Sequence, residues 1–88
     1  MTNYSLLSFV LRVERRKAIL LCLDNPKIPK EIAEICKVSI HNVSKSLKEL
    51  KDKNLITCKN PKDKFYRFYV LTNKGKEIKE TIIKKKEI

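Results

Sequence analysis

The chain's only histidine lies in a stretch whose polar residues could do chemistry. This stretch, SIHNVSKSLKEL, covers residues 39–50 and also carries an asparagine, serines and lysines. A histidine can act as a general base or a metal ligand, but either role needs a nucleophile or a second ligand at suitable spacing. No such partner accompanies His41, so we do not expect a catalytic or metal site here.

The apolar residues of the same stretch predict an α-helix that runs to about Lys53. With a turn of about 100° per residue, the side expected to pack against the core consists of Ile40, Val43, Ser46, Leu47 and Leu50. The residues on the opposite side or at its flanks are His41, Asn42, Ser44, Lys45 and Lys48, and Ser39 is a suitable N-cap.

The polar side of this helix has side chains that can read DNA. Asparagine can bond bidentately to adenine, lysine can donate to guanine, and the major groove admits one α-helix. His41 could donate to a phosphate or a base, Ser44 could donate to a phosphate, and the free N–H groups near Ser39 form a further phosphate site. The alternative is an ordinary solvated face, on which Asn42 belongs to a capping box.

Composition points to a polyanionic partner. The 88 residues include 21 Lys+Arg against 10 Asp+Glu, a formal net charge of +11. Mixed charges would keep a protein soluble equally well, so this excess indicates DNA, RNA or an anionic membrane. A lysine-rich genome or thermophilic composition is the alternative explanation.

Length and residue usage predict one small, mainly helical domain over residues 1–88. One glycine and three prolines argue against a many-turned β protein. Hydrolase, kinase and dinucleotide motifs are absent from the sequence, and so small a core leaves little room for an enclosed pocket, so we expect no enzyme.

The cysteines predict no metal or disulfide framework. Cys22, Cys36 and Cys58 are isolated and odd in number, with no CxxC pair. We therefore expect no metal and no cofactor. The longest apolar run is six residues, at 18–23, which is too short for a membrane span. We expect a cytoplasmic protein with buried, reduced thiols.

Periodicity and breakers predict the remaining elements. Residues 13–23 have a helical stripe, and Pro29 opens a short helix over residues 29–36. Strands are expected at residues 55–59 and 65–71 around a turn at 60–64. Thr72 can cap a closing helix over residues 73–86. The fold class is mainly α with a small β-hairpin, in the order α-α-α-β-β-α, with an extra helical segment at the N-terminus.

Several ordered segments, taken together, resemble archaeal and bacterial MarR/ArsR-like winged helix-turn-helix regulators. They are residues 13–20 (VERRKAIL), 29–33 (PKEIA), 38–50 (VSIHNVSKSLKEL), 54–56 (NLI) and 69–75 (YVLTNKG). The likeness extends from about Phe9 to Ile82. The sequence departs from the family at Lys37, where glycine is usual in the turn, and at Ile28, where Ser or Thr usually caps the helix.

The resemblance implies a sequence-specific regulator that binds double-stranded DNA. It makes residues 29–53 the helix-turn-helix, with the recognition helix 40–53 in the major groove, and residues 55–71 the hairpin wing on the backbone or minor groove. The wing residues expected to contact DNA are Lys59, Lys62, Lys64 and Arg67, and the first helix adds possible backbone contacts from Arg15, Arg16 and Lys17. The aromatic residues at 65–69 are expected to pack mostly against helices and not to stack on bases.

The apolar ends of the chain favour a homodimer. The expected interface residues are Leu6, Leu7, Phe9, Val10, Ile78 and Ile82. The alternative is that the two ends pack on each other within one chain. Two other functions also remain open at the level of sequence: a winged-helix protein-interaction module within a nucleic-acid machine, and a non-specific DNA- or RNA-binding protein.

Overall fold

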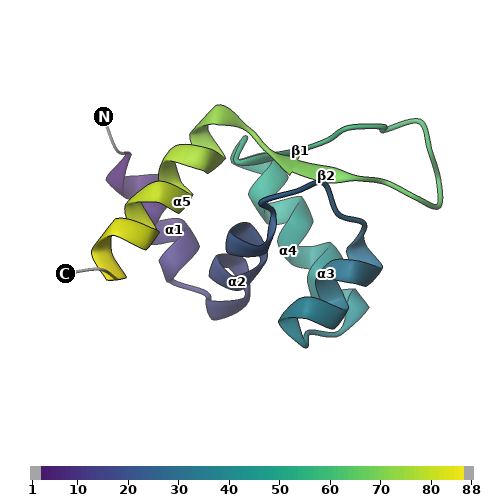
Figure 1. The fold of residues 1–88 in the computed structure, drawn as a ribbon, viewed down its shortest axis with the longest axis horizontal. Helices are drawn as coiled ribbons and strands as arrows, with labels where there is room; N and C mark the ends of the chain where they lie inside the picture. Colours follow the sequence, from purple (N-terminus) through teal and green to yellow (C-terminus); the bar gives the residue numbers. More distant parts are fainter. Residues whose placement is uncertain (1–2, 87–88) are drawn as a thin grey trace.

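The computed structural model describes residues 3–86, with side chains up to residue 84. The elements within this range are α1 (Tyr4–Leu11), α2 (Glu14–Cys22), α3 (Pro29–Cys36), α4 (Ile40–Asp52), β1 (Ile56–Cys58), β2 (Tyr69–Leu71) and α5 (Asn73–Lys86). Figure 1 shows α1 and α5 together at one end, and α3, α4 and a projecting hairpin at the other. The predicted fold class is confirmed: this is a winged helix with an additional N-terminal helix.

α3 and the turn that follows it form despite two unusual residues, Ile28 before the helix and Lys37 after it. Ile28 gives α3 no side-chain cap, but Oε1 of Glu31 accepts the backbone N–H of Ile28 at 3.1 Å. Lys37 ends α3 in the left-handed conformation, with φ 55° and ψ 45°. A glycine would adopt this conformation freely, whereas a lysine costs about 1 kcal/mol there.

The recognition-helix candidate, α4, begins and ends as the sequence predicts. Oγ of Ser39 accepts the backbone N–H of Asn42 at 3.3 Å, which makes Ser39 the N-cap. Asn54, just beyond the helix, has φ 58°. Asparagine tolerates this left-handed conformation better than most residues, so the chain can turn sharply into β1.

A single apolar cluster joins all five helices to the hairpin. Its buried members are Leu7, Val10, Ile19, Leu20, Leu23, Ile32, Val43, Leu47, Leu50, Leu55, Ile56, Ile78 and Ile82. One residue predicted for this core is placed differently. Ile40 is 53% exposed, because it is the first residue of α4 and has no preceding helical turn to cover it.

Four residues predicted for a dimer interface are instead buried within this chain. Leu7 and Val10 of α1, and Ile78 and Ile82 of α5, are at most 3% exposed. The two helices contact each other and pack on the common core (Figure 1). That assignment is therefore corrected: these side chains form intrachain contacts and are not available to a second copy.

The remaining predicted interface residues, Leu6 and Phe9, are partly buried against the same core. Among the residues whose side chains the structure describes, the large apolar ones that stay exposed at this end are Tyr4, Leu11 and Ile83.

The hairpin strands are shorter than predicted. β1 and β2 pair antiparallel, with Ile56 opposite Leu71 and Cys58 opposite Tyr69. Lys27, before α3, extends this pairing: its N–H donates to the carbonyl of Tyr69 at 3.2 Å, and it accepts from the N–H of Tyr69 at 2.9 Å. Residues 65–68 lie outside the strands because side chains of the loop, described below, bind their backbone groups.

The chain's only glycine fixes how α5 meets the hairpin. A Cβ on Gly75 would lie 2.1 Å from the carbonyl oxygen of Leu55, so no other residue fits without movement. Thr72 holds the same junction, since its Oγ1 donates to the carbonyl of Asn54 at 2.6 Å and accepts the N–H of Gly75 at 3.1 Å. Thr72 is thus the N-cap of α5, as predicted.

Candidate nucleic-acid interface

The outer face of α4 carries the polar side chains that the sequence singled out. His41, Asn42, Ser44, Lys45 and Lys48 are all exposed, while Val43, Ser46, Leu47 and Leu50 are buried. Within the part of the chain that the structure describes, none of the five exposed side chains forms a hydrogen bond or ion pair. The hydroxyl of Ser39, by contrast, is used as the N-cap. The outer face is thus free to contact a ligand.

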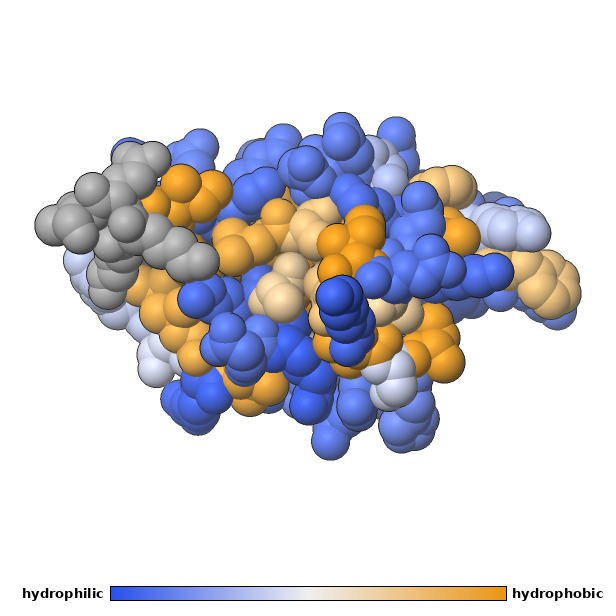
Figure 2. Space-filling view, turned by 60° about the horizontal axis from the view of Figure 1, so that its bottom comes forward, coloured by the Kyte–Doolittle hydropathy of each residue, from blue (hydrophilic) through white to orange (hydrophobic). Residues whose placement is uncertain are grey.

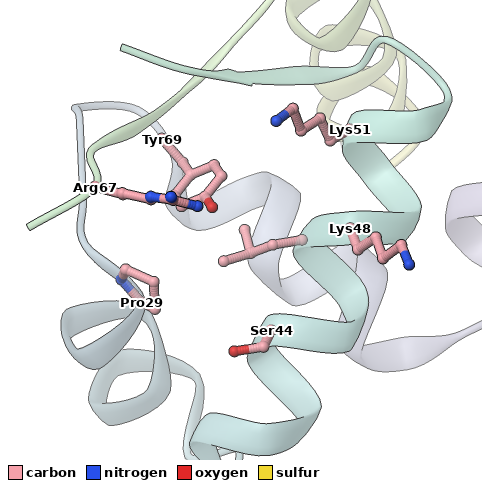
Figure 3. A pocket seen from close by; sticks show the side chains of 7 residues that line it. Pro29, Ser44, Lys48, Lys51, Arg67 and Tyr69 are labelled. Carbon is pink, nitrogen blue, oxygen red and sulfur yellow. The ribbon is translucent and has the colours of Figure 1, made fainter. Parts of the chain in front are cut away.

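A groove separates α4 from the wing. Its volume is about 310 Å³, and its lining residues are Pro29, Ser44, Leu47, Lys48, Lys51, Arg67 and Tyr69. In Figure 3 the polar ends of Ser44, Lys51 and Arg67 point into this groove, whereas the ammonium group of Lys48 points away from it. The groove therefore has cationic groups on both walls, one from α4 and one from the hairpin.

Lys51 and Tyr69 are two residues of this groove that the sequence analysis did not predict as site residues. Lys51 continues the exposed row that passes through Ser44 and Lys48, at the i, i+4 and i+7 spacing of one helix face, so the helical wheel could have found it. Tyr69 was counted among residues that pack against helices, and it does contact the core. Its position at the mouth of the groove depends on the pairing with Lys27, which no local pattern reveals.

The tip of the wing is held in place by two polar side chains. Oδ1 of Asp63 accepts the backbone N–H groups of Phe65 and Tyr66, both at 2.9 Å. These two bonds hold the pKa of the Asp63 carboxyl below its usual value, because they stabilise the charged form. Asn60 binds the other side of the loop: Oδ1 accepts the N–H of Phe68 at 2.8 Å, and Nδ2 donates to the carbonyl of Tyr66 at 2.6 Å.

Lys59, Lys62 and Lys64 are exposed along this loop, as expected for a basic wing. Arg67 is also exposed, and its Nε donates to the carbonyl of Asp63 at 2.7 Å. In Figure 2 the projecting end of the molecule is mostly hydrophilic, with some apolar surface among the charged groups. The sequence interpretation missed one feature of this loop: Phe65 is 85% exposed and Tyr66 is 62% exposed.

The arginines at the start of α2 are engaged inside the fold. Nε of Arg15 donates to Oγ of the buried Ser46 at 2.7 Å. The guanidinium of Arg16 binds both carboxylate oxygens of Glu49, at 3.3 and 2.8 Å, and also donates to the carbonyl of Phe9 at 3.0 Å. These bonds hold both guanidinium groups against α4, and the possible role of Arg15 and Arg16 as DNA-backbone contacts stays a prediction. Lys17, the third residue of that set, is half-buried.

The two arginines lower the pKa of the Glu49 carboxyl. The hydrogen bonds from Arg16 lower the pKa of its carboxyl against the opposing effect of burial, and the nearby charges of Arg16, Arg15 and Lys45 lower it further. The Arg16 guanidinium also lies over the ring of Phe9, 3.9 Å from its centroid. This cluster joins α1 and α2 to the inner side of α4, so it sets the position of the helix whose outer face is free.

All three cysteines are half-buried; Cys22 and Cys36 pack against the apolar core, and the thiol of Cys58 donates to Oδ1 of Asn60 at 3.8 Å. Burial, and then the neighbouring thiol of Cys36, raise the pKa of Cys22 to about 12, which makes it a poor nucleophile. Among the described residues there is no group of three or more His, Cys, Asp or Glu side chains placed to hold a metal ion. Over the same part of the chain, no helix is both long and apolar enough to cross a membrane.

Comparison with known proteins identifies similar structures. Neither a protein-family model nor a curated protein sequence matches the chain. Lactococcus lactis ZitR, solved in complex with DNA, aligns with a TM-score of 0.73 and 27% identity over 83% of this chain and 51% of its own. The chain thus spans about half the length of ZitR.

Two other solved structures share the fold. The MarR family transcription regulator SP03579 aligns with a TM-score of 0.77 and 22% identity, over 94% of this chain and 60% of its own. The second is the homodimeric winged helix-turn-helix DNA-binding domain of Mycobacterium bovis Mb0332, which is described as a possible ArsR-family transcriptional regulator. It aligns with a TM-score of 0.77 and 17% identity, over 96% of this chain and 79% of its own. The first is described as a transcription regulator, and the second as a possible one.

Proposed function

The chain is a winged helix-turn-helix protein similar to MarR and ArsR-like transcriptional regulators, and on this premise we propose that it is a sequence-specific regulator that binds double-stranded DNA. In this proposal α4 enters the major groove, the wing lies along the backbone and minor groove, and the protein acts in the cytoplasm. The observation that carries the proposal is the groove between α4 and the wing, with cationic side chains on both walls.

The shape of this surface supports duplex DNA as the ligand. A helix in the major groove and a wing in the adjacent minor groove must straddle one sugar–phosphate strand. The groove between α4 and the hairpin provides that space, and Lys51 and Arg67 point into it from opposite walls (Figure 3). We assign these two residues to the phosphates of the enclosed strand.

The outer face of α4 supplies the proposed base contacts. Asn42 and Lys45 are the main candidates, because an amide can bond to adenine and an ammonium to guanine. His41, Ser44 and Lys48 lie on the same exposed side and supply further base or phosphate contacts. The exposed Ile40 adds an apolar group that can contact a thymine methyl.

The wing supplies sequence-independent affinity in this proposal. Residues 59–75 carry five basic side chains and one acidic side chain, a net charge of +4. Lys59, Lys62 and Lys64 are exposed there and are assigned to phosphates, while Lys17 is retained as a possible phosphate contact from α2. Phosphate contacts fix register and orientation but carry no direct sequence information.

We further propose that the protein binds as a homodimer. A two-fold dimer of helix-turn-helix units reads two half-sites about one helical turn apart and so gains affinity. The exposed apolar residues at the α1–α5 end, Tyr4, Leu11 and Ile83, are the proposed contact, replacing the buried residues named from the sequence. This end lies away from the hairpin, so pairing there leaves the proposed DNA surface open (Figure 1).

Selection of bound duplexes from a random pool tests the proposal. We expect a consensus sequence, and a bound complex whose log affinity falls with log salt at a slope of about −0.9 for each phosphate contacted. Recovery of many unrelated sequences with the same salt slope would favour a non-specific nucleic-acid-binding protein. Absence of appreciable duplex binding would favour a protein-interaction module.

A further inference from the structure

Phe65 and Tyr66 stand exposed at the tip of the wing, although apolar side chains of this size normally gain from burial. Phe65 is the most exposed of the large apolar side chains in the described part of the chain. The expectation that helices would cover these rings is wrong, because the chain turns away from its helices at residues 60–68. Two large rings are thus presented to solvent at the end of a projecting hairpin.

The backbone beneath these rings is fixed. Asp63 accepts both of their N–H groups, and Asn60 accepts from Phe68 and donates to the carbonyl of Tyr66. Arg67 closes the loop through its bond to the carbonyl of Asp63. Because the tip is ordered by its own side chains, the rings need not lose backbone entropy when they enter a ligand.

The charges around the rings restrict what the ligand can be. Lys59, Lys62, Lys64 and Arg67 outnumber Asp63 within the same loop, so residues 59–68 carry a net charge of +3. Two copies of the tip would repel each other. The partner must therefore combine an anionic rim with an apolar interior, and a nucleic-acid duplex does so, with phosphates at the edge of a stack of bases.

We propose that Phe65 is an apolar wedge that enters the minor groove, with Tyr66 beside it, and bends the DNA by partly unstacking one base step. Apolar side chains inserted in this way kink duplexes by about 20–90°. Lys62 and Lys64 bind the phosphates that border the groove. This inference rests on the proposed placement of the wing on duplex DNA, and it adds a structural change in the DNA itself.

Bending is measured on a mixed-sequence duplex labelled at its ends with a donor and an acceptor dye, at low salt, where binding does not require a preferred sequence. We expect wild-type protein to shorten the end-to-end distance. Phe65→Ala should abolish most of this change and bind about tenfold more weakly. Phe65→Leu should retain much of the bend, because leucine keeps an apolar volume at the tip.

Lys62→Ala is the matched control from the same loop. It should weaken binding, yet leave the dye distance of the saturated complex unchanged. All three substitutions are at exposed positions, and unchanged thermal unfolding midpoints would verify that the wing is intact. A 2-aminopurine placed in the duplex should brighten on binding of wild type and of Lys62→Ala, but not of Phe65→Ala.

The inference is overturned if wild type binds the duplex without bending it, or if Phe65→Ala bends it as wild type does. It is also overturned if duplex binding is absent and the rings instead support binding to anionic lipid vesicles. The first two outcomes leave the proposed function standing, whereas the absence of duplex binding, or of a consensus in duplex selection, is a failure of the proposed function itself. A sequence-specific regulator that leaves its DNA straight would contradict the wedge alone.

Discussion

At the scale of single residues, Arg16 is a cation whose contacts lie within the fold, so it differs from the exposed lysines on the outer face of α4. Its guanidinium binds Glu49, the carbonyl of Phe9 and the face of the Phe9 ring. These contacts fix the inner side of α4 against α1 and α2. Lys45 and Lys48, on the outer side of the same helix, form no hydrogen bond or ion pair within the described residues. The cations available to a ligand are therefore fewer than the sequence suggests.

The Arg16–Glu49 pair predicts a pH-dependent contribution to stability. The pKa of Glu49 is lower in the folded protein than its usual value, so its contribution is complete above about pH 4.5 and is lost as pH falls through the folded-state pKa. We expect Glu49→Gln to lower the free energy of unfolding by about 1 kcal/mol at pH 7, and by progressively less as pH falls through the folded-state pKa of Glu49. Urea unfolding at several pH values measures this difference.

Glu34→Gln is the control, because Glu34 is exposed and forms no ion pair in the described structure. This substitution should change the free energy of unfolding little at every pH. Asp24 and Asp63 also have lowered pKa values, but they are present in all three proteins and cancel in the differences. A Glu49→Gln effect that is independent of pH would show that the charge of this carboxylate does not stabilise the fold.

The residue-level predictions succeeded where periodicity alone decides exposure. The helical wheel correctly placed Val43, Leu47 and Leu50 on the buried side of α4, and Lys45 and Lys48 on its exposed side. It could not show that Arg16 meets Glu49, because these residues are 33 positions apart and their pairing depends on how α2 crosses α4.

At the scale of elements, the junction between the hairpin and α5 is the most constrained point of the fold. Thr72 binds backbone groups on both sides of the junction, and Gly75 lets α5 approach the backbone of Leu55. We expect Gly75→Ala to destabilise the protein by at least about 2 kcal/mol, because the added methyl group would overlap a carbonyl oxygen. Thermal or urea unfolding measures the loss.

Lys74→Ala is the matched control, since Lys74 is exposed in the same turn of α5. It should change the free energy of unfolding by no more than about 0.5 kcal/mol. Equal stability of Gly75→Ala and wild type would mean that α5 can move away from Leu55 at little cost, contrary to the close contact described above.

The elements were predicted best where local residue types determine their ends. Pro29 begins α3 and Ser39 caps α4, as expected. The hairpin was predicted too long, because the β-forming aromatic residues suggested a strand from residue 65. The side chains of Asn60 and Asp63 compete for the backbone N–H groups that a longer ladder would need.

At the scale of the whole molecule, the two ends differ in the surfaces they expose. The hairpin end combines the groove, the outer face of α4 and the basic wing with its exposed Phe65 and Tyr66, whereas the α1–α5 end exposes Tyr4, Leu11 and Ile83 (Figure 1). A hollow at the latter end is lined by Tyr4, Leu7, Ser8, Leu11 and Arg12. We therefore propose that the hairpin end binds DNA and that the α1–α5 end forms the dimer interface.

Leu11→Glu tests the pairing end. A carboxylate there should be costly to bury in an interface, so we expect the dimer–monomer dissociation constant to rise by at least about tenfold. Sedimentation equilibrium measures this change. Ser5→Glu adds the same charge on α1 outside the hollow and should have little effect. A wild-type protein that remains monomeric at high concentration, or a Leu11→Glu variant that dimerises as wild type does, would contradict this interface.

The homodimer interface was the feature that the sequence could least determine. Apolar ends are equally consistent with packing inside one chain and packing between two chains, and only the three-dimensional contacts distinguish them. The contacts of α1 with α5 show that most of the predicted interface is core, which leaves a smaller exposed set centred on Tyr4 and Leu11.

The central claim is that α4 reads base sequence, and the ratio of affinities for a selected duplex and its scrambled counterpart tests it most directly. We expect the double variant Asn42→Ala/Lys45→Ala to lose about 1–3 kcal/mol of this discrimination for each base contact removed. Lys62→Ala should weaken binding to both duplexes alike and leave the ratio unchanged. If the double variant keeps the wild-type ratio, α4 does not read the bases and the proposed recognition surface is wrong.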